Sequence, residues 1–251
     1  MTEAQLHHFA TLAMLASAAV ALLALRFVAA PYGRHARGGW GPALPARTAW
    51  LVMEAPASLG FLIVFLLGPR RADAAPLALL ALWQAHYVHR AFVYPFRAKG
   101  GRAMPLPVAL LGATFNLWNT YINARHVSAF GAYPDAWLLD PRFASGVLLF
   151  GLGEYINLRA DGVLLRLRTP GETGYKIPRG WLFDHVTSPN YLGEIVAWIG
   201  WAVATWSLPG AAFALFTIAN LAPRAAKHHA WYRATFPDYP ASRRVLVPHV
   251  W

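Results

Sequence analysis

One stretch decides the fold: Thr48-Ala-Trp-Leu-Val-Met-Glu54-Ala-Pro56-Ala-Ser-Leu-Gly-Phe-Leu-Ile-Val-Phe-Leu-Leu67. It carries a single ionisable side chain, Glu54, and is as long as the roughly 20 apolar residues that a helix needs to cross a bilayer. We therefore predict a membrane-spanning helix at 48–67. An ionisable group inside such a helix is energetically unfavourable, so Glu54 is a candidate functional residue by default.

The rest of the chain repeats this pattern of apolar runs separated by shorter polar segments. Hydrophobic residues make up 57% of the 251 residues and charged residues 13%, whereas a soluble domain carries about 25% charged residues. No polar stretch is long enough for a separate soluble domain, so we predict one all-α domain, 1–251, that is a multi-pass integral membrane protein with seven transmembrane helices. The six further spans are predicted at 6–30, 75–96, 105–124, 142–160, 190–207 and 209–226.

The positive charges between the predicted spans are distributed unequally. Sixteen Lys and Arg residues fall on the side of the loops after the first, third and fifth spans and of the C-terminal tail, with Arg159 and Arg224 at the adjoining span ends included. Four fall on the other side, with Arg142 at a span end included. The positive-inside rule then predicts a cytoplasmic C-terminus and an N-terminus outside. The net charge of +11 is thus explained by topology, without a nucleic-acid partner. The basic cytoplasmic face is where an anionic cofactor would bind.

Three carboxyl groups, those of Glu54, Glu154 and Glu194, lie within predicted spans. Pro56 loosens the helix next to Glu54, and such breaks are tolerated where they line a cavity. A carboxylic acid that stays protonated in an apolar site can donate a hydrogen bond to a carbonyl oxygen, as in ketosteroid isomerase. The alternative is that these acids pair with Arg or His on other helices and only stabilise packing.

The third predicted span carries Tyr87, Arg90 and Tyr94 on one helical face. The alternative for the tyrosines is an aromatic belt at the membrane interface. His86 and His89 could bind a metal in principle, but no further ligand accompanies them at metal-binding spacing. Cysteine is absent, which excludes disulfides, thiolate metal sites and cysteine nucleophiles. We expect no metal site.

Pairs of polar residues four apart recur at the predicted helix ends. Such pairs share a helical face and could bind the hydroxyl groups of a ribose, although a salt bridge or a helix N-cap would explain them equally well. The pairs are Asn157 with Asp161, Asn119 with Asn123, and Asn190 with Glu194.

The segment after the last predicted span places Arg224, His228 and Tyr232 on one helical stripe. Basic and aromatic residues there could anchor the chain at the membrane surface. Arg168 and Lys176 lie on the same predicted side, which makes phosphate binding a competing interpretation. No G-x-G-x-x-G or Walker motif is present, so any nucleotide would be held without a Rossmann fold.

An ordered set of motifs resembles the steroid 5-alpha-reductase family along nearly the whole chain. The element Asn190-Tyr-Leu-Gly-Glu194 alone is shared with sterol reductases and isoprenylcysteine methyltransferases. The further matching stretches are Leu44-Pro-Ala-Arg-Thr-Ala-Trp50, Glu54-Ala-Pro56, His86-Tyr87-Val-His89-Arg90-Ala-Phe-Val-Tyr94, Tyr133-Pro-Asp135, Pro170-Gly-Glu172, Gly174-Tyr-Lys-Ile-Pro178, Ala204-Thr-Trp-Ser-Leu-Pro209, His228-His229 and Asp238-Tyr-Pro-Ala-Ser-Arg243.

The resemblance implies hydride transfer from NADPH to the β-carbon of a Δ4-3-ketosteroid, in a protein acting as a monomer. Glu54 and Tyr87 match the pair that binds the 3-ketone, with Trp50 and Met53 on the substrate side, Met53 standing where the family has Gln. The part from about 105 to 251 would mainly bind NADPH. The positions matching cofactor-binding residues are Asn157, Asp161, Arg168, Tyr175, Lys176 (in place of Arg), Asn190, Glu194, Arg224, His228 and Tyr232, and more weakly Tyr94, Arg102 and Asn119.

Composition favours a bacterial source and hence an inner membrane, whereas family homologues reside in the endoplasmic reticulum membrane. Two alternatives remain open. A membrane methyltransferase of the isoprenylcysteine type would keep the C-terminal motif but would not explain Glu54 and Tyr87. A non-catalytic lipid- or sterol-binding membrane protein belongs to a different class. Consumption of NADPH with a Δ4-3-ketosteroid would separate these alternatives from a reductase.

Overall fold

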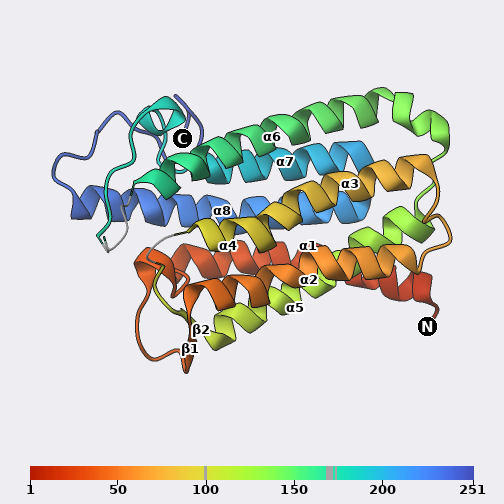
Figure 1. Cartoon of the computed structure of the whole chain (residues 1–251), viewed down its shortest axis with the longest axis horizontal. Coiled ribbons are helices and arrows are strands. Elements are labelled where there is room, and N and C mark those ends of the chain that lie inside the picture. The colour runs from red at the N-terminus through yellow and green to blue at the C-terminus, as the bar shows by residue number, and fades with distance from the viewer. Residues whose placement is uncertain (99–100, 168–171, 173) are drawn as a thin grey trace.

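The structure is a computed structural model that describes residues 1–98, 101–167, 172 and 174–251. Its long helices lie side by side along one axis (Figure 1), in agreement with the predicted all-α class. The α-helices are α1 Glu3–Phe27, α2 Ala46–Leu66, α3 Ala74–Val88, α4 Tyr94–Arg97, α5 Leu106–Arg125, α6 Pro141–Arg166, α7 Pro189–Thr205 and α8 Leu208–Thr235.

Short elements connect the helices. The strands β1 (Ala43–Leu44) and β2 (Met104–Pro105) pair antiparallel, with Leu44 opposite Met104. A π-helical turn, η2, continues α3 into α4, and a second one, η3, follows α5. The short helices are η1 Gly33–His35, η2 His89–Val93, η3 His126–Phe130, η4 Asp135–Leu139 and η5 Trp181–Asp184.

Each of the seven predicted spans corresponds to helix in the structure, the third being built from α3, η2 and α4. Two helices extend beyond the predicted span ends at 160 and 226. Helix α6 continues to Arg166 and α8 to Thr235. The hydropathy pattern detects only the apolar part of a helix, so polar C-terminal turns were predicted as loop and tail.

Among the described residues, two helices, α1 and α2, are by themselves both long and apolar enough to cross a membrane. Others fall short for visible reasons: α3 has 15 residues and α7 has 17, and α5 and α6 bury polar side chains such as Asn116 and Asp161. The seven-span topology and its orientation therefore remain predictions. The two chain ends lie at opposite ends of the bundle (Figure 1).

An aromatic cluster forms the core between α2, α3, α7 and α8. The rings of Phe61 and Trp83 stack at 4.4 Å between centroids, and those of Trp198 and Phe213 lie 4.3 Å apart. The Trp83 indole donates to the carbonyl of Ala57 at 2.8 Å. Buried indole N–H groups need such an acceptor, so the cluster fixes how α3 sits against α2.

Helices α6 and α7 approach each other closely because glycines face each other across the contact. A Cβ added at Gly193 would overlap the backbone of Asn157, and one at Gly153 would overlap the backbone of Ala197. Small residues allow backbones to approach in this way. The close contact places Asn157 of α6 against the first turn of α7, where the polar residues of the site begin.

Candidate active site

An inner cavity of about 130 Å³ lies among α2, α3, α5, α7 and α8. Two helices supply its predicted ketone-binding groups, Glu54 from α2 and Tyr87 from α3. The structure therefore brings together residues that are 33 positions apart in the chain, as the resemblance implied. Its lining also includes the predicted residues Trp50, Met53, Glu194 and Arg224.

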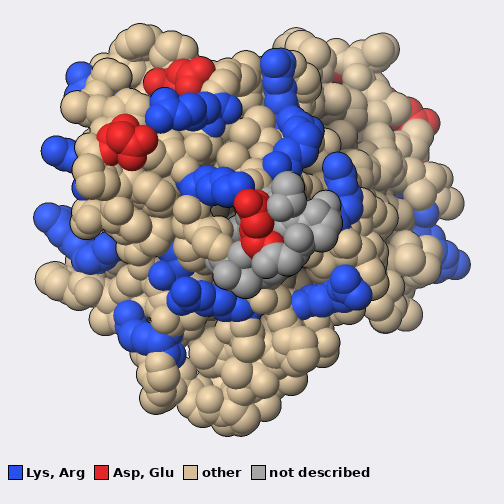
Figure 2. Space-filling model, turned by 60° about the vertical axis from the view of Figure 1, so that its left-hand side comes forward, with Lys and Arg blue, Asp and Glu red and all other residues tan. Residues whose placement is uncertain are grey.

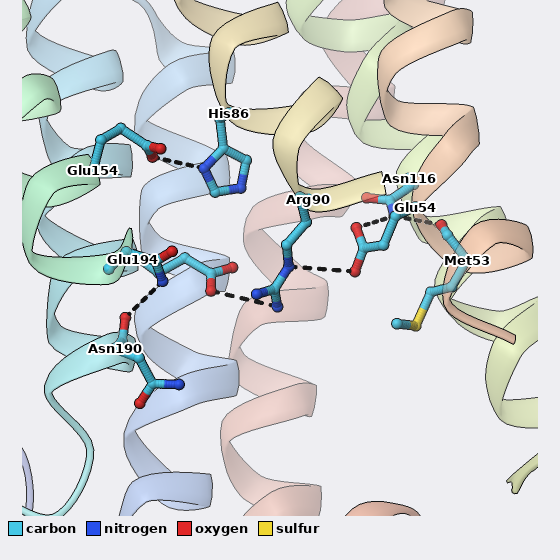
Figure 3. Close-up of polar contacts among 9 residues, drawn as sticks. Met53, Glu54, His86, Arg90, Asn116, Glu154, Asn190 and Glu194 are labelled. Atoms are coloured by element: carbon cyan, nitrogen blue, oxygen red, sulfur yellow. Dashed lines mark hydrogen bonds and ion pairs between the residues drawn. The ribbon is translucent and has the colours of Figure 1, made fainter. Parts of the chain in front are cut away.

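Asn116 of α5 fixes the carboxyl group of Glu54. Its side-chain amide donates to Glu54 Oε2 at 3.3 Å and to the carbonyl of Met53 at 2.7 Å. Figure 3 shows the carboxyl group of Glu54 between this amide and the guanidinium of Arg90. Asn116 was not predicted as a site residue, because nothing in the sequence indicates that α5 faces α2 at the level of Glu54.

Arg90 lies between two carboxyl groups (Figure 3). Its Nε is 3.8 Å from Glu54 Oε1, and its Nη2 is 3.6 Å from Glu194 Oε2. Its guanidinium also stacks over the ring of Trp50 at 5.0 Å. One cation between two acids is neutralised when one of the acids stays protonated. The arrangement is therefore compatible with a protonated Glu54 that donates a hydrogen bond.

Buried polar residues of α5 lie next to Tyr87 and connect it to a network of hydrogen bonds. Asn119 lies next to the Tyr87 side chain and is fully buried, outside the linings of the cavities described here. The amide of Asn123 donates to Asn119 Oδ1 at 2.9 Å, and the Trp201 indole donates to Asn123 at 2.9 Å. Asn119 is thus placed to position Tyr87, whereas the resemblance had implied a cofactor contact.

A second buried pair adjoins the inner cavity. His86, which lines the cavity, has its Nδ1 2.6 Å from Glu154 Oε1 of α6. Figure 3 shows this pair beside the Arg90 cluster. The alternative interpretation of Glu154, pairing with a His or Arg on another helix, is the one that the structure supports.

An outer cavity of about 230 Å³ adjoins the inner one and shares Tyr32, Trp50 and Arg224 with it. The charged side chains in its lining are all basic, which suits an anion. Its charged and imidazole groups are Arg34, His35, Arg102, Arg224, Lys227 and His228. The predicted cofactor residues Tyr94, Tyr175, Asn190 and Tyr232 also line it.

Arg34 and His35 of η1 were not predicted as site residues. The Arg34 guanidinium lies over the rings of Tyr232 at 4.5 Å and Trp231 at 5.2 Å, while its Nη1 and the Nε2 of His35 are buried without a hydrogen-bond partner. The His35 ring stacks on that of His228 at 5.3 Å. Burial lowers the pKa of His35 below its usual value, and the nearby cations add to this effect.

The three polar residues at the α6–α7 contact form a chain of hydrogen bonds. Asn157 donates to the backbone carbonyl of Asn190 at 3.0 Å, and the Asn190 amide donates to Asp161 at 3.3 Å. Only Asn190 lines the outer cavity; Asn157 and Asp161 are buried behind it. Asn157 and Asp161 thus hold Asn190 in place at the wall of the outer cavity.

A third and larger cavity, of about 610 Å³, shares Arg34, Tyr94, Tyr175 and Tyr232 with the outer one. Lys176 also lines it and pairs with Glu172 at 2.8 Å. The predicted residue Arg168 lies outside the described residues. Figure 2 turns this end of the bundle toward the viewer and shows Lys and Arg side chains spread across it.

Fold and site together define an all-α protein in which a buried cavity lined by two carboxyl groups adjoins a cavity whose charged side chains are all basic. The model of the 3-oxo-5-alpha-steroid 4-dehydrogenase family matches residues 102–251. The chain is 45% identical to 3-oxo-5-alpha-steroid 4-dehydrogenase 1 of Bos taurus, covering 91% of this chain and 91% of that protein. It is 42% identical to Steroid 5-alpha-reductase DET2 of Arabidopsis thaliana, covering 90% of both.

The chain therefore belongs to the steroid 5-alpha-reductase family, which confirms the resemblance found in its motifs. The family model begins at 102, so the agreement between 44 and 101 depends on the individual relatives, whose matches cover about nine tenths of the chain.

Proposed function

We propose that this protein is a membrane-embedded, NADPH-dependent reductase that saturates the Δ4 double bond of 3-oxo-steroids to give 5α-dihydrosteroids. One observation carries the proposal: the inner cavity with Glu54 and Tyr87 adjoins the basic outer cavity through shared walls. The names of the relatives, 3-oxo-5-alpha-steroid 4-dehydrogenase and steroid 5-alpha-reductase, supply the substrate class.

Glu54 and Tyr87 would polarise the steroid ketone. Negative charge develops on the ketone oxygen as C5 is reduced, and preorganised donors stabilise that charge more in the transition state than in the ground state. Asn116 holds the Glu54 carboxyl group from one side, and Asn119 lies next to Tyr87. Both donors are thereby fixed before the substrate arrives.

The residues present fit NADPH, which supplies a hydride when bound. Glu194 Oε2 is buried without a hydrogen bond and can accept one from the carboxamide of a nicotinamide at the boundary of the two cavities. Arg34 Nη1 and His35 Nε2 are also unpartnered, and they can donate to phosphate oxygens. The outer cavity that Arg34 and His35 line is also lined by the predicted cofactor residues Asn190, Arg224, His228 and Tyr232.

The membrane assignment is supported by the surface of the bundle. Large apolar side chains are exposed along α1, α2, α5 and α6, for example Leu23, Ile63, Leu111 and Leu148. Apolar patches of this extent indicate a lipid or protein environment. We infer that these faces contact lipid, and that a steroid enters the inner cavity from the bilayer.

The purified protein should oxidise NADPH only when a Δ4-3-ketosteroid such as testosterone or progesterone is added. Glu54→Ala should lower kcat/KM about 100-fold, the usual scale for loss of one preorganised donor, while NADPH binding, followed by fluorescence, is retained. Glu3→Ala is the matched control, because Glu3 pairs with Arg125 at the far end of α1.

Wild-type activity in Glu54→Ala would overturn the role of Glu54. Absence of any steroid-dependent oxidation would overturn the function, and transfer from S-adenosylmethionine to an isoprenylcysteine would then favour the methyltransferase alternative.

A further inference from the structure

The His86–Glu154 pair has no role in the function proposed so far. His86 is buried and lines the inner cavity, and its Nδ1 lies 2.6 Å from Glu154 Oε1. Such a short distance to a carboxylate is typical of a charge-assisted hydrogen bond. We therefore interpret the pair as a His86 imidazolium whose Nδ1–H donates to the carboxylate of Glu154.

Packing fixes the orientation of the His86 ring. It lies edge-on to Tyr87, with 4.9 Å between centroids, and to Trp198 at 4.7 Å. In Figure 3 the second ring nitrogen, Nε2, is turned away from Glu154, toward the side on which Arg90 lies. A proton on Nε2 is thus presented to the cavity beside the Tyr87 side chain that would bind the ketone.

The charged and titratable groups around His86 come from every neighbouring helix. Glu154 is the partner within hydrogen-bonding distance, and the others act over longer distances. They are Glu54 of α2, Arg90 and His89 of η2, Asp161 of α6 and Glu194 of α7.

Reduction of a 3-oxo-Δ4-steroid leaves one proton to be supplied. The hydride adds two electrons and a hydrogen at C5, the C4–C5 double bond is lost, and the ketone becomes an enolate between C3 and C4. A proton must then reach C4, the carbon bonded to the carbonyl carbon that Glu54 and Tyr87 would hold.

We propose that His86, held by Glu154, is the acid that protonates C4; this rests on the proposed reductase function. The Nε2–H bond breaks and its proton forms the new C4–H bond. The C3–C4 double bond of the enolate supplies the electron pair, and the C3 ketone is restored. His86 is left neutral, with Nδ1–H donating to Glu154, and a proton from water restores the imidazolium.

The reverse of this proton step can be measured without hydride transfer. The saturated 5α-dihydro-3-ketosteroid is incubated in D₂O with the protein and oxidised cofactor only, and deuterium at C2 and C4 is read by NMR. Both carbons adjoin the ketone, so uncatalysed exchange labels both, whereas His86 serves C4 alone. We expect the wild type to label C4 at least tenfold faster than C2.

His86→Gln should lower the C4 exchange rate and the rate of steroid reduction about 100-fold, within the range for general acid–base catalysis. His89→Gln, one turn along and outside the cavity lining, is the matched control and should exchange like the wild type. Thermal unfolding and NADPH binding report whether each variant is folded.

Glu154→Gln keeps a hydrogen-bonding partner but removes the charge. Exchange requires neutral His86, so its rate rises with pH as the imidazolium loses its proton. Without the carboxylate that loss occurs at lower pH, and the midpoint of the exchange profile should move to lower pH. A merely structural role would leave the midpoint in place.

Equal labelling of C2 and C4, or wild-type C4 exchange in folded His86→Gln, overturns the proposal. If steroid reduction persists in that case, the proposed reductase function stands without it. If the wild type reduces no steroid, the proposed function itself fails.

Discussion

At the scale of single residues, the site depends on side chains that hold other side chains. Asn116 is the clearest case, because its amide joins α5 to α2 by two hydrogen bonds, one to the Glu54 carboxyl group and one to the backbone carbonyl of Met53. A side chain that donates a hydrogen bond to the substrate ketone must be positioned within a fraction of an ångström to stabilise the transition state. Asn116 therefore matters to catalysis although it need not touch the substrate.

Asn116→Ala should reduce kcat/KM for the steroid about tenfold, since a net hydrogen bond contributes about 0.5–1.5 kcal/mol. The Kd of NADPH should not change, because Asn116 lies outside the lining of the outer cavity. Steady-state kinetics and cofactor titration measure the two effects. Ser58→Ala is the control: it removes the hydrogen bond from Ser58 of α2 to Gln84 without touching Glu54. An equal loss of kcat/KM in both variants would contradict the positioning role.

Some site residues could be predicted from the sequence because their side chains are of a type that is rare at such positions. Glu54 and Glu194 stood out because ionisable groups are rare within apolar helices. Glu154 stood out for the same reason, but neither its partner His86 nor the role of Asn116 could be identified, because which side chains meet depends on which helices face each other. Arg34 was counted only as a loop charge, and its role becomes visible once Tyr232 and Trp231 surround it.

At the scale of elements, the segment between α1 and α2 contributes to the outer cavity in a way that was not predicted. It was predicted only as a basic loop, yet η1 lies on the C-terminal part of α8 and closes the outer cavity. This contact requires α8 to continue beyond 226, which the hydropathy pattern did not show. The extension is helical because the run from Arg224 to Thr235 holds good helix formers and, after Pro223, no proline.

His35 of η1 should make cofactor affinity depend on pH. Burial, with Arg34, Arg37 and Lys227 nearby, lowers the pKa of His35, so the free protein holds it neutral near pH 7. A bound phosphate favours the imidazolium, so binding takes up a proton. The Kd of NADPH should therefore decrease as pH falls from about 7 toward the lowered pKa. Fluorescence titration across this range measures it.

The comparison with His35→Gln isolates this contribution from the titration of the cofactor's own phosphate. The ratio of the variant's Kd to that of the wild type should grow as pH falls. His8→Gln, an exposed histidine at the other end of α1, should leave the profile unchanged. A ratio independent of pH would mean that no phosphate lies against His35.

At the scale of the whole molecule, charge and shape agree on one orientation. Figure 2 faces the end of the bundle that carries the C-terminus and shows Lys and Arg side chains across it, whereas the N-terminus lies at the other end (Figure 1). An odd number of membrane crossings requires this separation. The positive-inside rule predicts that the basic end faces the cytoplasm, where a soluble anionic cofactor would reach the outer cavity.

The absence of cysteine makes this topology directly testable by single-cysteine labelling in intact bacterial cells. Thr2→Cys, Ala72→Cys and Ala136→Cys are exposed positions at the end predicted to lie outside, and should react with a membrane-impermeant maleimide. Ser242→Cys, exposed after α8, should react only after the cells are permeabilised, because seven crossings place it in the cytoplasm. Retained steroid reductase activity is the control for folding. If positions 2 and 242 react from the same side, the number of crossings is even, and if Ser242→Cys reacts in intact cells, the cofactor face has been assigned wrongly.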